Sequence, residues 1–239
     1  MKYFKTLLLT IIGLLFGTTL FAHALWIETN TSGKIGQAHE VKLYYGEYAE
    51  NERDVVSKWY SDVKDLTLWL VGPDQQKIKL TTTLGESVAT ASFVPKGNGQ
   101  YTLLVSHAAK DLAGTTQYHF LTSAIVHVGK LPSQIDAAAI SNDLKIFPET
   151  TAAYTNNTAI QLKAMHNGAL KKGATVSVFS PSGWSKVLKT NNEGIVEFTP
   201  IWPGRYVVEV TDYQEKKAEE GEKASGAVWQ GATHSFEVK

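Results

Sequence analysis

The sequence contains seven histidines and no cysteine, so histidine is its main candidate for a nitrogen or sulfur metal ligand. Without thiols, thiolate metal sites, iron–sulfur clusters and cysteine nucleophiles are excluded. His23 has the most informative place, three residues ahead of Trp26, where a secretory signal peptide is expected to end. If the signal peptidase cuts after Ala22, His23 becomes the first residue, and its α-amino group and imidazole can chelate one metal ion. An internal histidine cannot provide both groups.

The first 22 residues have the pattern of a signal peptide. Two lysines, Lys2 and Lys5, precede an apolar run over 7–16. This run is shorter than a membrane-spanning helix requires. We therefore predict removal of segment 1–22, a periplasmic or secreted location, and no membrane insertion after cleavage. A cut after Ala24 also fits the small-x-small rule and would discard His23, so the sequence leaves both cleavage positions open.

Composition narrows the function classes. Basic and acidic residues each number 23, so the formal net charge is zero and no overall field attracts nucleic acid or an anionic membrane. The sequence has no Gly-x-Ser-x-Gly nucleophile motif and no phosphate-cradling glycine loop. We therefore expect no nucleic-acid partner and no enzymatic activity, with a copper oxidase as the one enzyme that the sequence leaves open.

The elements that must position the histidines are strands. Short segments rich in Val, Thr, Tyr, Phe and Leu alternate with turn residues, which predicts an all-β protein of β-sandwich type. A Gly-x-Tyr motif opens a strand twice, at 99–101 and at 204–206. We predict two related β-sandwich modules, at 23–130 and 158–239. The strand pattern lapses in segment 131–157, which we expect to be a linker or crossing segment.

The expected strands decide which histidines could join His23. Strand 116–128 places His119 and His127 on one face, but roughly 26 Å apart at ~3.3 Å per residue, too far to share an ion. His107 ends the preceding strand, and a hairpin would bring it close to His119. We predict that His107 and His119 complete a metal site with His23. The weaker candidates are His127 and His234.

The second half of the chain resembles the transthyretin-like or carboxypeptidase-regulatory-like sandwiches of exported bacterial proteins. The residues that carry this resemblance are Gly173 to Val178, Thr190 to Phe198 and Pro203 to Tyr206. The glycines suit turns, and the tyrosine suits the core beside the opposite sheet. The resemblance implies a fold of two immunoglobulin-like or transthyretin-like β-sandwich modules and implies nothing about chemistry.

The whole mature chain resembles the periplasmic components of cobalt or nickel uptake systems. The matching features are the HALWIE stretch at 23–28, the Gly-x-Tyr strand at 99–101 and the tail from Trp229 to His234. The family commonly places a histidine directly after the signal, which favours the cut after Ala22. The resemblance implies metal handling and a membrane metal transporter as partner. The acidic residue often found after the histidine is absent here, where Ala24 stands, so no carboxylate ligand is expected at that position.

Three functions follow as expectations. The first is a periplasmic protein that binds nickel or cobalt for uptake or buffering. Imidazole and amine donors also suit copper and zinc, but not calcium or magnesium. The alternative is an adhesion or carbohydrate-binding sandwich without metal, for which Tyr48, Trp59 and Tyr60 are the aromatic residues expected to be exposed. The third is a copper oxidase with a terminal-histidine brace, which requires a second histidine on the same ion.

Overall fold

The computed structural model describes residues 23–130, 132, 134–151, 153–216 and 226–239, so the predicted signal peptide lies outside the described part of the chain. Within these residues the regular secondary structure is almost entirely strand, with four short 3-10 segments at 48–50, 56–58, 63–65 and 137–139. The strands are β1 (Ala24–Thr29), β2 (Ser32–Gly33), β3 (His39–Gly46), β4 (Leu68–Val71), β5 (Lys77–Leu80), β6 (Thr83–Leu84), β7 (Ala89–Phe93), β8 (Gly99–Ala113), β9 (Thr116–Val128), β10 (Leu144–Pro148), β11 (Ile160–His166), β12 (Ala169–Leu170), β13 (Thr175–Phe179), β14 (Ser185–Lys189), β15 (Ile195–Phe198), β16 (Gly204–Glu215) and β17 (Ala227–Val238).

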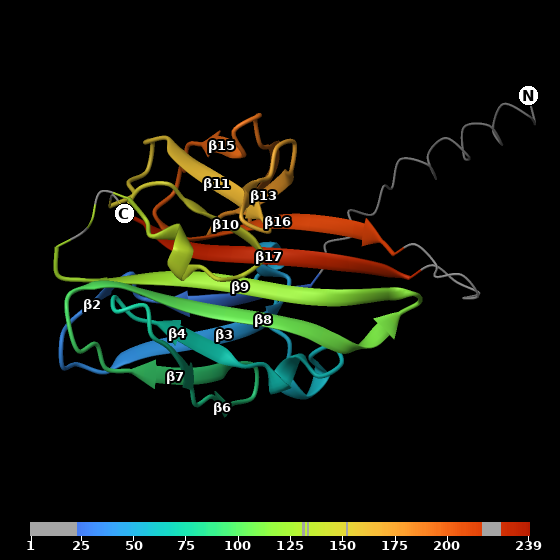
Figure 1. Cartoon of the computed structure of the whole chain (residues 1–239), viewed down its shortest axis with the longest axis horizontal. Helices are drawn as coiled ribbons and strands as arrows, with labels where there is room; N and C mark the ends of the chain where they lie inside the picture. Colours follow the sequence, from blue (N-terminus) through green and yellow to red (C-terminus); the bar gives the residue numbers. More distant parts are fainter. Residues whose placement is uncertain (1–22, 131, 133, 152, 217–225) are drawn as a thin grey trace, which may run out of the picture.

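The strands form three sheets (Figure 1). The N sheet has the order β1-β3-β7-β6. The central sheet has the order β14-β13-β16-β17-β9-β8-β4-β5, with β2 paired to β9. The C sheet contains β10, β11 and β12, with β15 paired to β11. In Figure 1 the N sheet and the C sheet lie on opposite sides of the long central strands.

The central sheet is shared by two hydrophobic cores, because successive side chains of a strand point to opposite faces. In β9, Phe120 packs into the core beneath the N sheet, together with Leu43 and Leu103. Its neighbour Leu121 packs into the core beneath the C sheet, together with Leu162. The all-β prediction with two β-sandwich modules is confirmed, and each module uses one face of the same sheet.

A parallel strand pair joins the two modules. Residues 227–235 of β17 pair in register with residues 116–124 of β9, although the two strands are far apart in the sequence. β17 also pairs along its whole length with β16 of the second module, from Ala227↔Glu215 to Val238↔Gly204. The modules are therefore joined through backbone hydrogen bonds and not only through a connecting segment.

Both modules contain the same corner, formed by a proline, a glycine and a tyrosine. Gly99 has φ +136, and a Cβ there would lie 2.7 Å from Pro73. The Tyr101 hydroxyl donates to the Gly97 carbonyl at 3.0 Å. This back-bonded tyrosine is the tyrosine corner of immunoglobulin-like sandwiches.

The second corner matches the first. Gly204 has φ +126, with Pro181 2.9 Å from the place of a Cβ. The Tyr206 hydroxyl donates to the Trp202 carbonyl at 3.0 Å. The repeated Gly-x-Tyr motif of the sequence is thus a repeated structural device.

Two parts of the chain differ from the sequence-based expectation. Segment 131–157 is not only a linker, because it contains β10, which pairs with β11 in the C sheet. The aromatic residues Tyr48, Trp59 and Tyr60 are also less exposed than the carbohydrate-binding alternative expects. Trp59 is buried at 4% exposure, and Tyr60 and Tyr48 are half-buried, with their hydroxyls bonded to backbone carbonyls.

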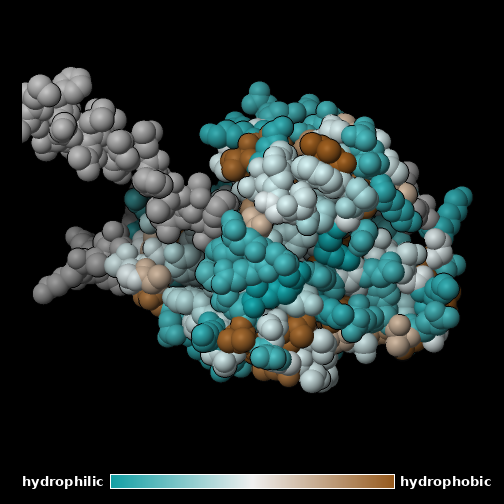
Figure 2. Space-filling model, turned by 180° about the vertical axis from the view of Figure 1, so that it is seen from behind, coloured by the Kyte–Doolittle hydropathy of each residue, from teal (hydrophilic) through white to brown (hydrophobic). Residues whose placement is uncertain are grey.

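One face of the molecule is mostly hydrophilic. Figure 2 shows one face covered by hydrophilic side chains, with hydrophobic residues scattered between them. Scattered apolar residues of this kind are normal on a protein surface and do not mark an interface. Among the described residues, none of the helical segments has the length and apolar character needed to cross a bilayer.

Candidate functional site

The first strand holds His23 at a fixed place on the molecule. β1 begins at Ala24, which pairs with Gly46 of β3. Trp26 of β1 is fully buried, and it packs against Phe179 and Val207 of the central sheet. The Thr233 hydroxyl of β17 donates to the Leu25 carbonyl at 2.6 Å. Because β1 is bound both to the N sheet and to the central sheet, the residue just before it has a defined position.

The imidazole of His23 lies between two carboxylates. Its Nδ1 is 3.2 Å from Oε1 of Glu47, and its Nε2 is 3.4 Å from Oδ2 of Asp54. The His23 side chain is 44% exposed, whereas the two acidic side chains are 13% and 18% exposed. The site is therefore a half-open imidazole above two largely buried acids.

A tight loop after β3 brings the two acids together. Gly46 has φ +148, and a Cβ there would lie 2.6 Å from the Glu52 carbonyl oxygen, so the close approach requires glycine. The Glu52 amide donates to the Glu47 carbonyl at 3.0 Å, and the Asp54 amide donates to the Tyr45 carbonyl at 2.9 Å. The loop thus returns Asp54 to the end of β3, opposite Glu47.

The electrostatics of this site favour a cation. Burial raises the pKa of Glu47, the nearby His23 opposes this shift, and the other acids of the loop, Glu52, Asp54 and Glu50, add to it. The Tyr45 ring packs 5.4 Å from the His23 ring, and burial followed by the Asp54 charge raises the pKa of its hydroxyl. Grouped carboxylates of this kind gain free energy from an imidazolium or a metal ion between them.

The donor set is chemically suited to a divalent transition metal. An imidazole with two carboxylates supplies the nitrogen and oxygen ligands that such ions accept, and a free amine on His23 would add another nitrogen. In the described part of the chain, no three His, Asp or Glu side chains already surround a common metal position. Each ring nitrogen of His23 faces a different carboxylate, so an ion would bind after the half-exposed imidazole turns.

His107 and His119 are not brought together on one face. The hairpin of β8 and β9 forms as expected, but β8 does not end at His107 and continues to Ala113. Its register pairs His107 with Phe120 and Ala108 with His119. Directly opposed residues share a face and successive residues alternate, so the two imidazoles point to opposite faces of the central sheet.

Each of these two histidines already has partners of its own. His107 Nε2 lies 3.0 Å from Oδ1 of Asp62, which also accepts a hydrogen bond from the Lys110 amide. Although burial alone would raise it, hydrogen bonds from Lys110 and His107 hold the pKa of the Asp62 carboxyl far below its usual range. His119 contacts the Ser106 hydroxyl at 2.8 Å, and burial lowers the pKa of its imidazole.

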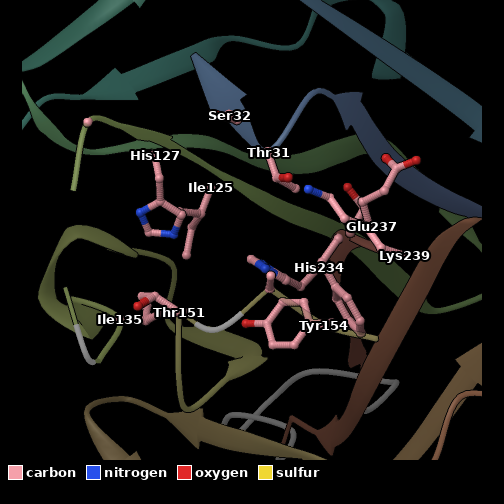
Figure 3. A pocket seen from close by; sticks show the side chains of 14 residues that line it. Thr31, Ser32, Ile125, His127, Ile135, Thr151, Tyr154, His234, Glu237 and Lys239 are labelled. Atoms are coloured by element: carbon pink, nitrogen blue, oxygen red, sulfur yellow. The ribbon is translucent and has the colours of Figure 1, made fainter. Parts of the chain in front are cut away.

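The two weaker candidates, His127 and His234, line one cavity (Figure 3). They lie on the face of the central sheet opposite His23, with Tyr154 and Thr151 across the cavity. They are therefore separate from the site at β1.

Sequence reasoning did not identify Glu47 and Asp54. They lie in an irregular loop, where no periodic pattern tells which side chains face each other. One signal was present: four acids, Glu47, Glu50, Glu52 and Asp54, occur within eight residues directly after a strand.

Comparisons with known proteins address the family and the fold. No curated protein matches the chain. Among solved structures, a Salmonella alpha-2-macroglobulin reacted with methylamine aligns at 9% identity and a TM-score of 0.31, covering 89% of this chain and 15% of that chain. This chain thus spans 15% of the length of that protein. A segment of two fibronectin type-III domains from chicken tenascin aligns at 13% identity and a TM-score of 0.26, covering 84% of this chain and 95% of the other.

The sequence also matches a family model over most of its length. The model is described as a domain of unknown function, DUF4198, and the match runs over residues 20–213. It therefore includes His23 with both carboxylates and extends through most of β16. The chain belongs to the DUF4198 family.

Proposed function

We propose that this protein binds a divalent transition-metal ion at His23 and serves nickel or cobalt uptake or buffering in the periplasm. The observation that carries the proposal is the place of the His23 imidazole, 3.2 and 3.4 Å from the carboxylates of Glu47 and Asp54. A half-open imidazole beside two carboxylates offers nitrogen and oxygen donors to a divalent ion.

Three further observations support the proposal. The predicted peptidase cut after Ala22 would give His23 a free amine next to its imidazole. The HALWIE stretch resembles periplasmic components of cobalt or nickel uptake systems, in which a histidine commonly follows the signal directly. The neighbours of both ring nitrogens are carboxylates. This donor set suits a divalent ion held by nitrogen and oxygen ligands. A copper brace would instead require a second histidine beside His23. A membrane metal transporter is the partner this function requires.

The experiment is a calorimetric titration of the mature protein with Ni(II) and Co(II) at pH 7.5. His23→Ala is expected to lower the affinity at least tenfold, which is about 1.4 kcal/mol. His166→Ala is the matched control. His166 also pairs with a carboxylate, 3.5 Å from Asp212, but that carboxylate is already neutralised by Lys171 at 2.5 Å. The control variant should bind as the wild type does.

Three results would contradict the proposal. Equal loss of affinity in both variants would mean that any surface histidine contributes, and that β1 holds no specific site. Equal affinity of His23→Ala and the wild type would remove His23 from metal binding and leave the adhesion or carbohydrate-binding function as the better hypothesis. Mass spectrometry of the exported chain identifies its first residue, and a start at Leu25 would lead to the same conclusion.

A further inference from the structure

A cavity of about 210 Å³ lies on the face of the central sheet opposite His23 (Figure 3). β9 contributes Ile125 and His127 to its wall, and β17 contributes His234 and Phe236. Tyr154 closes the side that faces the C sheet. The metal site proposed above uses none of these residues, so the cavity needs an explanation of its own.

Both imidazoles keep hydrogen-bonding capacity that the protein does not use. His234 is 2% exposed, and its Nδ1 pairs with the Ser123 hydroxyl at 2.8 Å. Among the described residues, its Nε2 has no hydrogen-bond partner. Nδ1 of His127 also lacks a partner within the described part of the chain, but it has almost no accessible surface. The nitrogen of this ring that can meet a molecule in the cavity is Nε2, for which the described residues provide no hydrogen bond either. Ring nitrogens enclosed by protein are normally satisfied, so the two unused Nε2 atoms beside the cavity point to an occupant.

The interior of the cavity carries no net charge at neutral pH. Burial lowers the pKa of His127, and it lowers the pKa of His234 to about 3, so both rings are neutral. Burial also raises the pKa of the Tyr154 hydroxyl, which stays protonated and donates to the Thr150 carbonyl. Of the two charged residues at the wall, Glu237 pairs with Arg205 at 2.7 Å and Lys239 is exposed. An ionic ligand would find no buried countercharge.

The spacing of the histidines argues against a shared metal ion. His234 pairs with Ser123 in the register of β17 and β9, and His127 lies four residues further along β9. That step is about 13 Å along the strand at ~3.3 Å per residue. Two imidazoles on one ion need nitrogens within roughly 4 Å of each other, since metal–nitrogen bonds are about 2.0–2.1 Å. Figure 3 shows the two rings at separate places on the wall, with Ile125 between them.

Size and lining select the kind of molecule. An apolar cavity of about 150 Å³ holds a benzene molecule, so this cavity accommodates one slightly larger ring. Ile125, Ile135 and Phe236 provide apolar contacts for the faces of such a ring. The imidazoles provide hydrogen bonds at separate points of its edge. A polyol would leave several of its hydroxyls against these apolar side chains, at a cost in free energy.

We propose that this cavity binds a small uncharged phenol, a single aromatic ring whose polar groups pair with the free nitrogens of His127 and His234. The class is defined by an apolar ring of this size with hydrogen-bonding groups at its two ends. This ligand site is independent of metal binding at His23, and either can fail without the other.

The probe for the test is 4-hydroxybenzyl alcohol, titrated into the mature protein and followed by NMR. p-Xylene has a similar shape without the hydroxyls and is the matched ligand control. The alcohol is expected to bind at least tenfold more tightly than p-xylene and to shift the resonances of His127 and His234. His127→Leu and His234→Leu should each remove most of this preference while leaving p-xylene binding in place. His127→Leu is the decisive variant if loss of the His234–Ser123 bond prevents folding.

The control variant is His166→Leu, which removes a histidine that does not line the cavity, and it should bind both ligands as the wild type does. Equal binding of 4-hydroxybenzyl alcohol and p-xylene would overturn the role of the histidines. Failure of both to bind would mean that the cavity holds only water. Ni(II) shifts of the His127 and His234 resonances in His23→Ala would overturn the phenol site in favour of a second metal site.

Discussion

The histidines on the two faces of the central sheet have opposite surroundings. On the N-sheet side, His23 is half-exposed and lies between two carboxylates. On the C-sheet side, His234 is buried, and its polar partner is the neutral hydroxyl of Ser123. The two modules have the same corner of proline, glycine and tyrosine, so the difference does not come from the scaffold. It comes from the acidic loop after β3, which the first module adds beside its histidine.

This difference teaches that the chemistry of a histidine follows from its surroundings more than from its type. In the proposals above, carboxylates and solvent suit the His23 region to a metal ion. Burial without charge suits the His234 region to neutral molecules. The predictions below test whether the two regions differ in this way.

The largest expected effect is on the acid stability of the His234 region. Its pKa is about 3 in the folded protein against an ordinary value of 6.5, so between these values the unfolded chain binds a proton that the folded chain does not. Stability should therefore fall as pH drops below 6.5, by about 1.4 kcal/mol per pH unit from this group. His234→Asn retains a partner for Ser123 and removes the titration. Urea unfolding between pH 7 and 4 should give a shallower decline for this variant than for the wild type.

His166→Asn is the control for this measurement, because His166 is less deeply buried and pairs with Asp212. His166→Asn should show the same decline of stability with falling pH as the wild type. Identical pH profiles for His234→Asn and the wild type would show that the His234 region is not a dry, uncharged environment.

The next prediction distinguishes the His107–Asp62 pair, which we expect to be structural, from the proposed metal site at His23. Asp62 accepts hydrogen bonds from His107 and Lys110, which hold its pKa below the ordinary value. The stability it contributes is present above the ordinary pKa of 3.8 and is lost as pH falls toward the folded value. Asp62→Asn should destabilise the protein by about 1–3 kcal/mol at pH 7 and leave Ni(II) affinity unchanged.

Thermal unfolding and metal titration of the same Asp62→Asn sample check both parts of this prediction. Asp65→Asn, in the same 3-10 region but exposed, should change neither quantity. A loss of Ni(II) affinity in Asp62→Asn would bring His107 back as a metal ligand and remove the distinction between the two pairs.

The smallest expected effect is on the individual carboxylates beside His23. Glu47→Gln and Asp54→Asn should each weaken Ni(II) binding by roughly three- to tenfold, up to about 1.4 kcal/mol, because each removes one charge near the ion. Glu50→Gln, in the same loop but exposed, is the control and should have a smaller effect. Isothermal titration of the three variants measures this order. Equal effects of all three would mean that the loop acts only through its overall charge.

The sequence allowed the fold class to be predicted because strand patterns and the repeated Gly-x-Tyr motif are local. The pairing of β9 with β17 was not predictable, since it joins strands more than a hundred residues apart through packing on both faces. β10 was missed because its strand pattern is short and ends at Pro148. The hairpin of His107 and His119 was predicted, but the face of each residue depends on a register that turn residues alone do not give.

The candidate site was predicted only in part. His23 could be selected from its place after the signal sequence. Glu47 and Asp54 could not be selected individually, because an irregular loop has no periodicity and the turn at Gly46 decides which acids face the histidine. The unused nitrogens of His127 and His234 were also beyond sequence reasoning, since they depend on which neighbours each ring contacts.

The central claim, that His23 at the mature amino terminus binds a transition metal with Glu47 and Asp54, has one most direct test. Ni(II) is titrated into two proteins that differ by one residue: a chain that begins at His23 and the same chain with one glycine ahead of it. The extra residue moves the free amine away from the ion and leaves the imidazole and both carboxylates in place. We expect at least tenfold weaker binding for the extended chain, about 1.4 kcal/mol. Equal affinity of the two chains would contradict metal binding through the terminal amine of His23.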